Sequence, residues 1–260
     1  MSAGGLAASG YETVEILGRL AGARPGTAIF RRSSGQPSRR AVLHVQAAGD
    51  PEVPPDLGPW YTGRAFHFYL LAGLRLPALA PVGTRPAARF LSAAFADLDA
   101  AWAHLRRVDG MASLIVSASG RGAIAAALWC AARPSVAEAL ILLEPELPVG
   151  SSLSLDIDCP ALVLTDPAAP ARPAQRGLVR TGPETAPGRP AAGRKLRGWP
   201  TRRQAAPAEG AGLQLGGHVT WLRLPAGPAV DDTAGRRQFF DELGRWLGAY
   251  MYGHVRDQLL

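Results

Sequence analysis

Short apolar runs rich in β-branched and aromatic residues alternate with longer segments of helical spacing, and this alternation constrains the fold more than any other feature of the chain. It is typical of a mostly parallel β-sheet covered by helices on both faces. Eight runs are predicted to be strands, at residues 12–17, 27–32, 41–45, 65–71, 114–117, 139–143, 161–164 and 219–224. The chain has 260 residues, 47% of them hydrophobic, which is enough to bury one full core, so a single α/β domain spanning residues 1–260 is expected.

Three helices are predicted from apolar residues that recur at helical spacing. The first precedes the fifth strand, and its acidic residues Asp97 and Asp99 are expected to point outward. The second follows the fifth strand and ends before Pro134, since proline disfavours a helical residue ahead of it. The third begins at Asp232 or Thr233, either of which can cap it, and presents one apolar stripe to the sheet.

The basic excess of the chain is concentrated in one segment. The formal net charge is +7, and nine basic residues lie between Arg172 and Arg203, where Glu184 is the one acidic residue. Residues 168–212 are rich in Pro, Gly, Ala and Arg and lack periodicity, so they are predicted to form a disordered insertion in the domain. The alternative is a basic segment that contacts phosphates of nucleic acid or acidic lipid. Trp199 is the only aromatic residue there, so nucleic acid is not favoured as a partner.

Other kinds of site are not indicated by the sequence. It contains no phosphate-binding loop, dinucleotide fingerprint or metal-ligand cluster, so no cofactor and no metal are expected. Cys130 and Cys159 lie in apolar contexts and do not make a disulfide framework, which favours a reducing, cytoplasmic location. No apolar stretch reaches the roughly 18 residues that a membrane helix needs, and no secretory leader is recognised, so neither a transmembrane span nor export is expected.

The segment LIVSASGRGA, residues 114–123, is the strongest candidate for chemistry. An apolar strand runs through small residues directly into a helix, as in the nucleophile elbow of serine hydrolases. Ser119 takes the nucleophile position in this interpretation, and the flanking glycines of the usual Gly-x-Ser-x-Gly pattern are replaced by Ser117 and Arg121. Taken alone, the segment is explained equally well by an ordinary tight turn between a strand and a helix.

Further segments occur around this one in the order found in a known family. They are AVLHVQ (41–46), PWYTGRAFHFY (59–69), GHVTWLRL (217–224) and FDELGRWL (240–247). Together with residues 114–123 they resemble the actinobacterial α/β-hydrolases of the serine aminopeptidase and monoacylglycerol-lipase-like branch. The resemblance covers nearly the whole chain apart from the insertion, and it implies the α/β-hydrolase fold.

The resemblance also assigns the remaining parts of a hydrolase site. The His-Gly pair that shapes the family's oxyanion hole corresponds to Gln46-Ala47, and the backbone N–H groups of Ala47 and Gly120 are the expected donors. The family's general base is a histidine in the loop after the last strand, and Ala229 stands at or near that position. Asp166, after the seventh strand, is the candidate acid, although a turn aspartate is the favoured interpretation.

The missing base decides the functional interpretation. A serine hydroxyl is a weak nucleophile without a base in hydrogen-bonding reach, and residues 224–232 contain no histidine. His218 begins the last strand, roughly 20 Å from the edge of the sheet where Ser119 is expected. The other histidines are expected inside the sheet (His44 and His67), on a helix (His104) and beyond the last helix (His254).

Two hypotheses follow for the function. The first is a catalytically impaired or non-catalytic hydrolase homologue that keeps the fold and has a binding or interaction role, with a small-molecule or acyl ligand. The alternative is a serine hydrolase of esters, acylglycerols or peptides with Ser119 as nucleophile and an unusual base. Association with nucleic acid through residues 172–203 is the least favoured. The side chain of Arg121 could cover the site or bind an acidic ligand.

Overall fold

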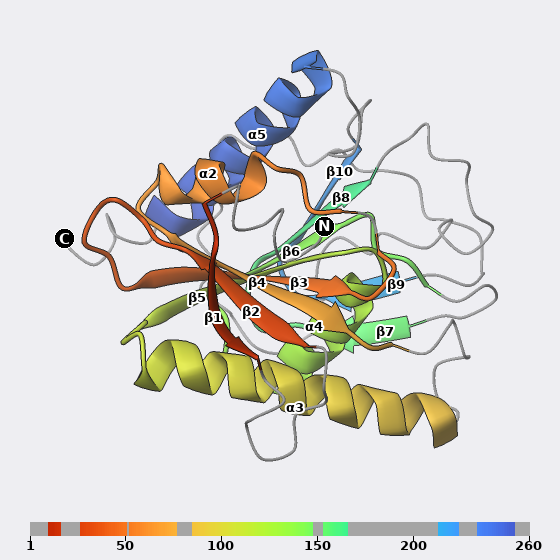
Figure 1. The fold of residues 1–260 in the computed structure, drawn as a ribbon. Helices are drawn as coiled ribbons and strands as arrows, with labels where there is room; N and C mark the ends of the chain where they lie inside the picture. Colours follow the sequence, from red (N-terminus) through yellow and green to blue (C-terminus); the bar gives the residue numbers. More distant parts are fainter. Residues whose placement is uncertain are drawn as a thin grey trace.

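The computed structural model describes residues 10–16, 27–50, 52–76, 85–147, 153–165, 213–223 and 233–252, and eight strands of this part form one sheet (Figure 1). The strands are β1 (Glu12–Ile16), β2 (Ala28–Arg32), β3 (Arg40–Ala47), β4 (His67–Leu74), β5 (Ser113–Ser119), β6 (Ala139–Leu143), β8 (Ala161–Thr165) and β10 (Val219–Arg223). Each of the eight predicted strands is confirmed.

The order of the strands across the sheet is β1-β2-β4-β3-β5-β6-β8-β10. β2 runs antiparallel to β1 and to β4, and the other neighbouring pairs of this sheet are parallel. This order, with its antiparallel second strand and a helix entered directly from β5, is the topology of the α/β-hydrolase fold. The predicted fold class, a mostly parallel eight-stranded sheet with helices on both faces, is confirmed.

Helices cover both faces of the sheet (Figure 1). α3 (Arg85–Arg107) and α4 (Gly120–Ala131) lie on one face, and α2 (Leu57–Thr62) and α5 (Thr233–Leu247) lie on the other. A π-helical turn, Gly248–Tyr252, continues α5. The three predicted helices are α3, α4 and α5, whereas the six residues of α2 are too few to give a helical period in the sequence.

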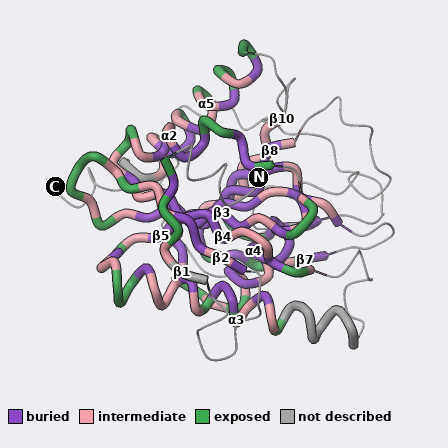
Figure 2. Tube along the Cα trace, in the orientation of Figure 1, coloured by how far each residue is buried: buried purple, intermediate pink, exposed green. Residues whose placement is uncertain are grey.

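The two faces of the sheet have separate cores, because successive side chains of a strand point to opposite sides. In β3, Leu43 and Val45 pack in the core under α3 and α4, whereas Val42 packs with α2 and α5. α5 contributes Phe239 and Trp246, both buried, to this second core. Figure 2 shows the central strands as a buried layer with exposed segments on the helices around it. Burial on both faces leaves the carboxyl ends of the parallel strands as the edge where a site can open.

Asp97 contradicts the prediction that it points outward. It is buried, and its Oδ2 accepts a hydrogen bond of 3.2 Å from the Thr27 hydroxyl. The hydroxyl ahead of β2 gives the carboxylate a partner inside, which the helical period of the sequence cannot reveal. Asp99 is exposed as predicted, and it accepts hydrogen bonds from Trp129 Nε1 and from Arg133.

A second, two-stranded sheet adds to the predicted architecture. β7 (Leu153–Asp156) pairs in parallel with β9 (Leu213–Gly216), and each strand leads within a few residues into β8 or β10 of the main sheet. Gly217 has φ +93°, and a Cβ there would lie 2.3 Å from the Ile157 carbonyl oxygen, so the turn into β10 requires glycine. Strands of four residues alternate too briefly to be predicted from the sequence.

Several predicted features lie outside the described residues. They are the insertion at residues 168–212, Asp166, Ala229, His254 and the expected helix cap Asp232. None of the helices in the described part of the chain has the length and apolar character needed to cross a membrane.

Candidate functional site at the turn after β5

The turn from β5 into α4 lies at the carboxyl edge of the sheet, where open α/β folds bind their ligands. Ser119 is the last residue of β5 and has extended backbone angles, with φ −122° and ψ 157°. Gly120 is the first residue of α4 and has φ +53°, in the left-handed region that favours glycine. The apex of the turn is therefore Gly120.

Ser119 lies one residue before this apex. In a nucleophile elbow the serine itself occupies the strained turn, which exposes its hydroxyl at the top of the sheet. Here the hydroxyl oxygen of Ser119 is buried and has no hydrogen-bond partner among the described residues. Strand alternation places it on the same face as Ser117, toward α2 and α5. The hydroxyl is thus held inside the protein.

Gly122 allows the start of α4 to cross closely over the end of β3. A Cβ at this position would lie 2.8 Å from the carbonyl oxygen of Val45 and 3.2 Å from the amide nitrogen of Ala47. These are backbone atoms of a central strand, so they cannot move aside as a flexible side chain could. With Gly120 at the apex, Gly122 also occupies the place of the second glycine in the Gly-x-Ser-x-Gly pattern.

The carboxylate of Asp50 fills the space in front of this turn. A tight turn after β3, closed by a hydrogen bond of 3.1 Å from the Asp50 amide to the Ala47 carbonyl oxygen, directs the side chain toward α4. Asp50 Oδ2 accepts hydrogen bonds from the backbone N–H of Ala47, at 3.1 Å, and of Gly122, at 2.9 Å. Asp50 Oδ1 accepts from the backbone N–H of Arg121, at 3.3 Å, and from its Nε, at 3.1 Å. The side chain is 1% exposed.

Asp50 and the apex of the turn exclude one another sterically. A Cβ on Gly120 would lie 3.0 Å from Asp50 Cγ and 3.2 Å from each carboxylate oxygen. Any side chain at residue 120 would therefore start in contact with the carboxylate, and a serine hydroxyl would have to displace it. Glycine at 120 satisfies both the backbone angle and the space.

Arg121 closes the site from the solvent side. Besides its contacts to Asp50, its guanidinium donates a hydrogen bond to the carbonyl oxygen of Ala48, and the side chain is 20% exposed. A Cβ at Gly49 would lie 3.0 Å from Arg121 Nη2, which shows how tightly the guanidinium lies on the turn. The acidic partner of Arg121 in the structure is therefore a group of the chain itself, Asp50.

Three backbone N–H groups converge on the Asp50 carboxylate. One is that of Ala47, and the others are those of Arg121 and Gly122, one and two residues beyond Gly120. The assignment of Ala47 and Gly120 as oxyanion donors stays a prediction. Asp50 was not among the predicted residues. The small Ala-Gly-Asp turn directly after a buried strand is the signal that could have indicated it, because aspartate at the end of such a turn commonly binds neighbouring backbone N–H groups.

The described histidines do not supply a base to Ser119. His44 is fully buried in β3, its Nδ1 lies 3.0 Å from the Ser117 hydroxyl, and burial lowers its pKa to about 3. It is therefore neutral at ordinary pH, as expected of an interior histidine. His218 immediately precedes β10 at the opposite edge of the sheet, where its carbonyl oxygen accepts a hydrogen bond from the amide of Ala161.

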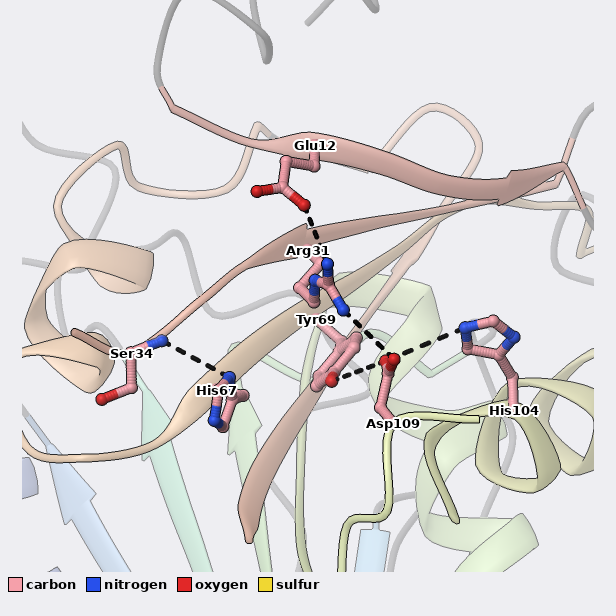
Figure 3. A network of polar contacts seen from close by, with 7 residues as sticks. All are labelled: Glu12, Arg31, Ser34, His67, Tyr69, His104 and Asp109. Atoms are coloured by element: carbon pink, nitrogen blue, oxygen red, sulfur yellow. Dashed lines mark hydrogen bonds and ion pairs between the residues drawn. The ribbon is translucent and has the colours of Figure 1, made fainter. Parts of the chain in front are cut away.

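The two remaining described histidines take part in polar contacts away from the turn (Figure 3). His67 Nδ1 lies 3.4 Å from the Ser34 amide. His104, on α3, points to Asp109, with 3.8 Å between Nε2 and Oδ2. Asp109 also accepts hydrogen bonds from the Tyr69 hydroxyl, at 2.8 Å, and from Arg31, at 3.1 Å. Burial, followed by the hydrogen bond to Asp109, raises the pKa of Tyr69.

Arg31 extends this network to β1 through an ion pair of 2.9 Å with Glu12. Asp109 precedes β5, whereas Asp50 follows β3, so the two carboxylates lie at opposite edges of the sheet. The Asp109 network connects β1, β2, β4 and the end of α3 through side chains alone, as Figure 3 shows. It is a structural clamp rather than a part of the turn after β5.

The described residues offer no metal centre and no reactive thiol. No three of their His, Cys, Asp or Glu side chains are grouped so that they could hold a metal ion. Cys130 and Cys159 are both buried, and burial raises the pKa of the Cys159 thiol to about 11 and that of Cys130 further. A thiol with a raised pKa carries little thiolate and is a poor nucleophile.

Comparison with known proteins gives distant structural similarity alone. No protein-family model matches the chain, and no curated protein sequence matches it. The structure is similar to a carboxylesterase from Mesorhizobium loti, with TM-score 0.43 and 13% identity over 61% of this chain and 77% of the other. The Francisella virulence factor BioJ gives TM-score 0.41 and 12% identity over 60% and 64%, so the chain spans less than two thirds of its length. A cold-adapted esterase from an Arctic intertidal metagenomic library gives 0.37 and 13% over 60% and 69%. The strand order, rather than these matches, establishes the fold.

Proposed function

We propose that this chain is a non-catalytic α/β-hydrolase-fold protein with a binding or interaction role. The observation that carries the proposal is the glycine at the apex of the turn after β5, Gly120, where a hydrolase of this fold has its nucleophile. Glycine has no side chain to attack a carbonyl group. The similarity of five sequence segments to the serine aminopeptidase and monoacylglycerol-lipase-like branch supports descent from an active hydrolase of that kind.

Two further features support the loss of catalysis. Acyl transfer by a serine needs a base that removes the hydroxyl proton and donors that stabilise the oxyanion. The sequence has no histidine at residues 224–232, where the resemblance puts Ala229 at or near the position of the base, and no described histidine reaches the turn. The backbone N–H groups that would receive an oxyanion are already bonded to Asp50.

The alternative, a serine hydrolase that uses Ser119, requires a large rearrangement. The Ser119 hydroxyl is buried and has no hydrogen-bond partner among the described residues, so neither substrate access nor an activating base is provided for it. Its extended backbone also keeps it in the strand. Asp166 would act only through a histidine, and that histidine is the missing part.

The test is labelling of purified, folded protein with a fluorophosphonate, which reacts with activated serines without needing the natural substrate. We expect no labelling of the wild type, and the same result for Ser119→Ala. A known serine hydrolase in the same reaction shows that the probe is active, and Ser117→Ala is the matched control for a neighbouring buried serine. Stoichiometric labelling of the wild type that is lost in Ser119→Ala, but kept in Ser117→Ala, would overturn the proposal.

A small molecule or an acyl group is the ligand class that the fold's ancestry supports. The ligand can be sought by native mass spectrometry of the purified protein, followed by extraction and identification of whatever remains bound. Retention of a defined small molecule or fatty acyl compound at about one per chain is the expected result. Hydrolysis of the retained compound by the protein would contradict a purely binding role.

A further inference from the structure

We propose that Asp50 is a built-in occupant of the oxyanion-binding groups of this fold, so that the protein carries its own anion where a hydrolase would bind that of its substrate. The inference rests on the proposed function in taking Gly120 as the nucleophile position. It goes further by assigning a role to Asp50 and a ligand chemistry to the groups around it.

The donors on Asp50 match those of an oxyanion hole one by one. In this fold the hole is made by the backbone N–H of the residue after the nucleophile together with an N–H from the loop after the third strand. With the apex at Gly120, the first of these is the N–H of Arg121 and the second is that of Ala47. Both donate to the Asp50 carboxylate, at 3.3 Å and 3.1 Å.

The carboxylate is bound as a complete anion would be. Its two oxygens share four donors, since Gly122 N–H and Arg121 Nε add to the two backbone groups above. Successive N–H groups at a helix start form a concave nest for an anion, and a guanidinium beside it adds a positive charge. The side chain is 1% exposed, so water does not compete for these donors.

The short connection makes this occupant difficult to displace. Asp50 follows Ala47 by three residues on a turn closed by its own backbone hydrogen bond, so the carboxylate is held next to the donors at a high effective concentration. A free carboxylate or phosphate in solution has to compete with it. Arg121 additionally covers the turn through its hydrogen bond to the Ala48 carbonyl oxygen. The intact protein is therefore expected to ignore small anions at this site.

Removal of the Asp50 carboxylate should turn the same groups into an open site for one small carboxylate. In Asp50→Ala, three inward-pointing backbone N–H groups and the Arg121 Nε lose their acceptor while the fold that positions them remains. Gly120, with no side chain, leaves the adjoining space clear. Formate, a carboxylate without a side chain, is the probe that fits the vacated volume.

The experiment compares thermal unfolding of the wild type and Asp50→Ala in equal concentrations of sodium formate and sodium chloride. In chloride, the variant is expected to unfold roughly 10 °C below the wild type, because it leaves buried donors without an acceptor. Formate should restore at least half of this loss in Asp50→Ala and leave the wild type unchanged. Asp99→Ala is the matched control, since Asp99 also binds an arginine but is 47% exposed and lies away from the turn.

Two results would overturn the inference. One is an Asp50→Ala protein whose melting temperature lies within about 1 °C of the wild type, which would mean that the carboxylate is not bound as described. The other is a destabilised variant whose response to formate is not specific, because chloride has the same effect on it or because Asp99→Ala responds to formate equally. These melting temperatures are measured without the fluorophosphonate, so this inference and the proposed function can fail independently.

Asp50→Asn keeps the test decisive if Asp50→Ala does not fold. The amide preserves the shape, but its NH2 replaces one acceptor oxygen and faces backbone N–H groups. The amide proton resonances of Ala47, Arg121 and Gly122 should move upfield relative to the wild type as their hydrogen bonds weaken. Unchanged resonances at these three positions would exclude a role for the Asp50 charge.

Discussion

Two largely covered carboxylates, Asp50 and Asp109, lie at opposite edges of the sheet and are held in different ways. Asp50 takes three of its four hydrogen bonds from backbone N–H groups and is 1% exposed. Asp109 is 10% exposed and accepts hydrogen bonds from the side chains of Tyr69 and Arg31, with His104 Nε2 3.8 Å from its Oδ2. Backbone donors are set by the fold and persist through every substitution except that to proline, whereas each side-chain donor to Asp109 can be removed alone. The first arrangement suits an anion site, and the second suits a clamp between strands.

The largest expected effect separates the two carboxylates directly. Asp50→Ala should lower the free energy of unfolding by about 3–5 kcal/mol, because four donors, one of them charged, lose their acceptor in a closed site. Asp109→Ala should lower it by about 2–3 kcal/mol, since its freed side chains can turn toward water. Urea unfolding measures both values. A larger loss for Asp109→Ala would reverse the comparison.

The next largest effect is a loss of stability at low pH that comes from the buried, neutral side chain of His44. The pKa of His44 is lowered by burial from 6.5 to about 3 in the folded protein. Below pH 6.5 the unfolded chain binds a proton that the folded protein refuses, so stability is present above pH 6.5 and is lost as the pH falls toward 3. The loss is about 1.4 kcal/mol per pH unit, or about 3 kcal/mol at pH 4.

His44→Gln isolates this histidine from the carboxylates, which also contribute to acid unfolding. The difference in unfolding free energy between the wild type and His44→Gln, measured by urea at several pH values, should shrink from pH 7 to pH 4. A constant difference over that range would show that His44 does not stay neutral in the folded protein.

A smaller effect tests the contact between Asp50 and the apex of the turn. Gly120→Ala should cost about 2 kcal/mol, from the left-handed φ of +53° and from a Cβ 3.0 Å from Asp50 Cγ. Gly110 is the matched control, because it has φ +68° and no heavy atom within 4 Å of its Cβ position, so Gly110→Ala reports the backbone cost alone, about 1 kcal/mol. Equal losses would show that the carboxylate does not obstruct residue 120.

The smallest effect probes the side-chain donors of Asp109. Tyr69→Phe removes the hydroxyl that donates to Asp109 and should cost about 1–1.5 kcal/mol. Tyr61 is equally buried, but the Ser117 hydroxyl that neighbours its own hydroxyl is uncharged, so Tyr61→Phe should cost less than Tyr69→Phe. Chemical denaturation of the two variants side by side tests the difference. A greater loss for Tyr61→Phe would mean that the Tyr69 hydrogen bond contributes little.

The central strands of the main sheet, β3, β4, β5, β6 and β8, could be predicted because they are buried on both faces and read as runs of apolar residues. β7 and β9 could not be predicted, since a strand of four residues carries too little pattern. The burial of Asp97 could not be predicted either, because a helical period does not show that the Thr27 hydroxyl is available as its partner in the interior. The sequence located the turn after β5, but the order Ser-Ala-Ser-Gly-Arg-Gly permits more than one apex. The positive φ of Gly120 identifies this residue as the apex. The assignment of Ser119 as a nucleophile stays a prediction.

The site itself was less accessible to sequence reasoning. Ala47 could be named from the sequence because the resemblance fixed the end of the third strand, and its role as an oxyanion donor stays a prediction. The role of Asp50 could not be predicted, because it depends on a contact between two segments that lie about seventy residues apart in the chain. Gly122 is the local sign that the Gly-x-Ser-x-Gly pattern is centred on residue 120 instead of Ser119, because it lies two residues after Gly120.

The mutual exclusion of residue 120 and Asp50 also constrains how such a protein can change over generations. A serine placed at 120 would meet the carboxylate 3.0 Å from its Cβ, and loss of Asp50 alone would leave a cluster of donors without an acceptor. Each single substitution that would place a serine hydroxyl at this turn therefore passes through a less stable protein. The pair Gly120 and Asp50 is expected to change together or not at all.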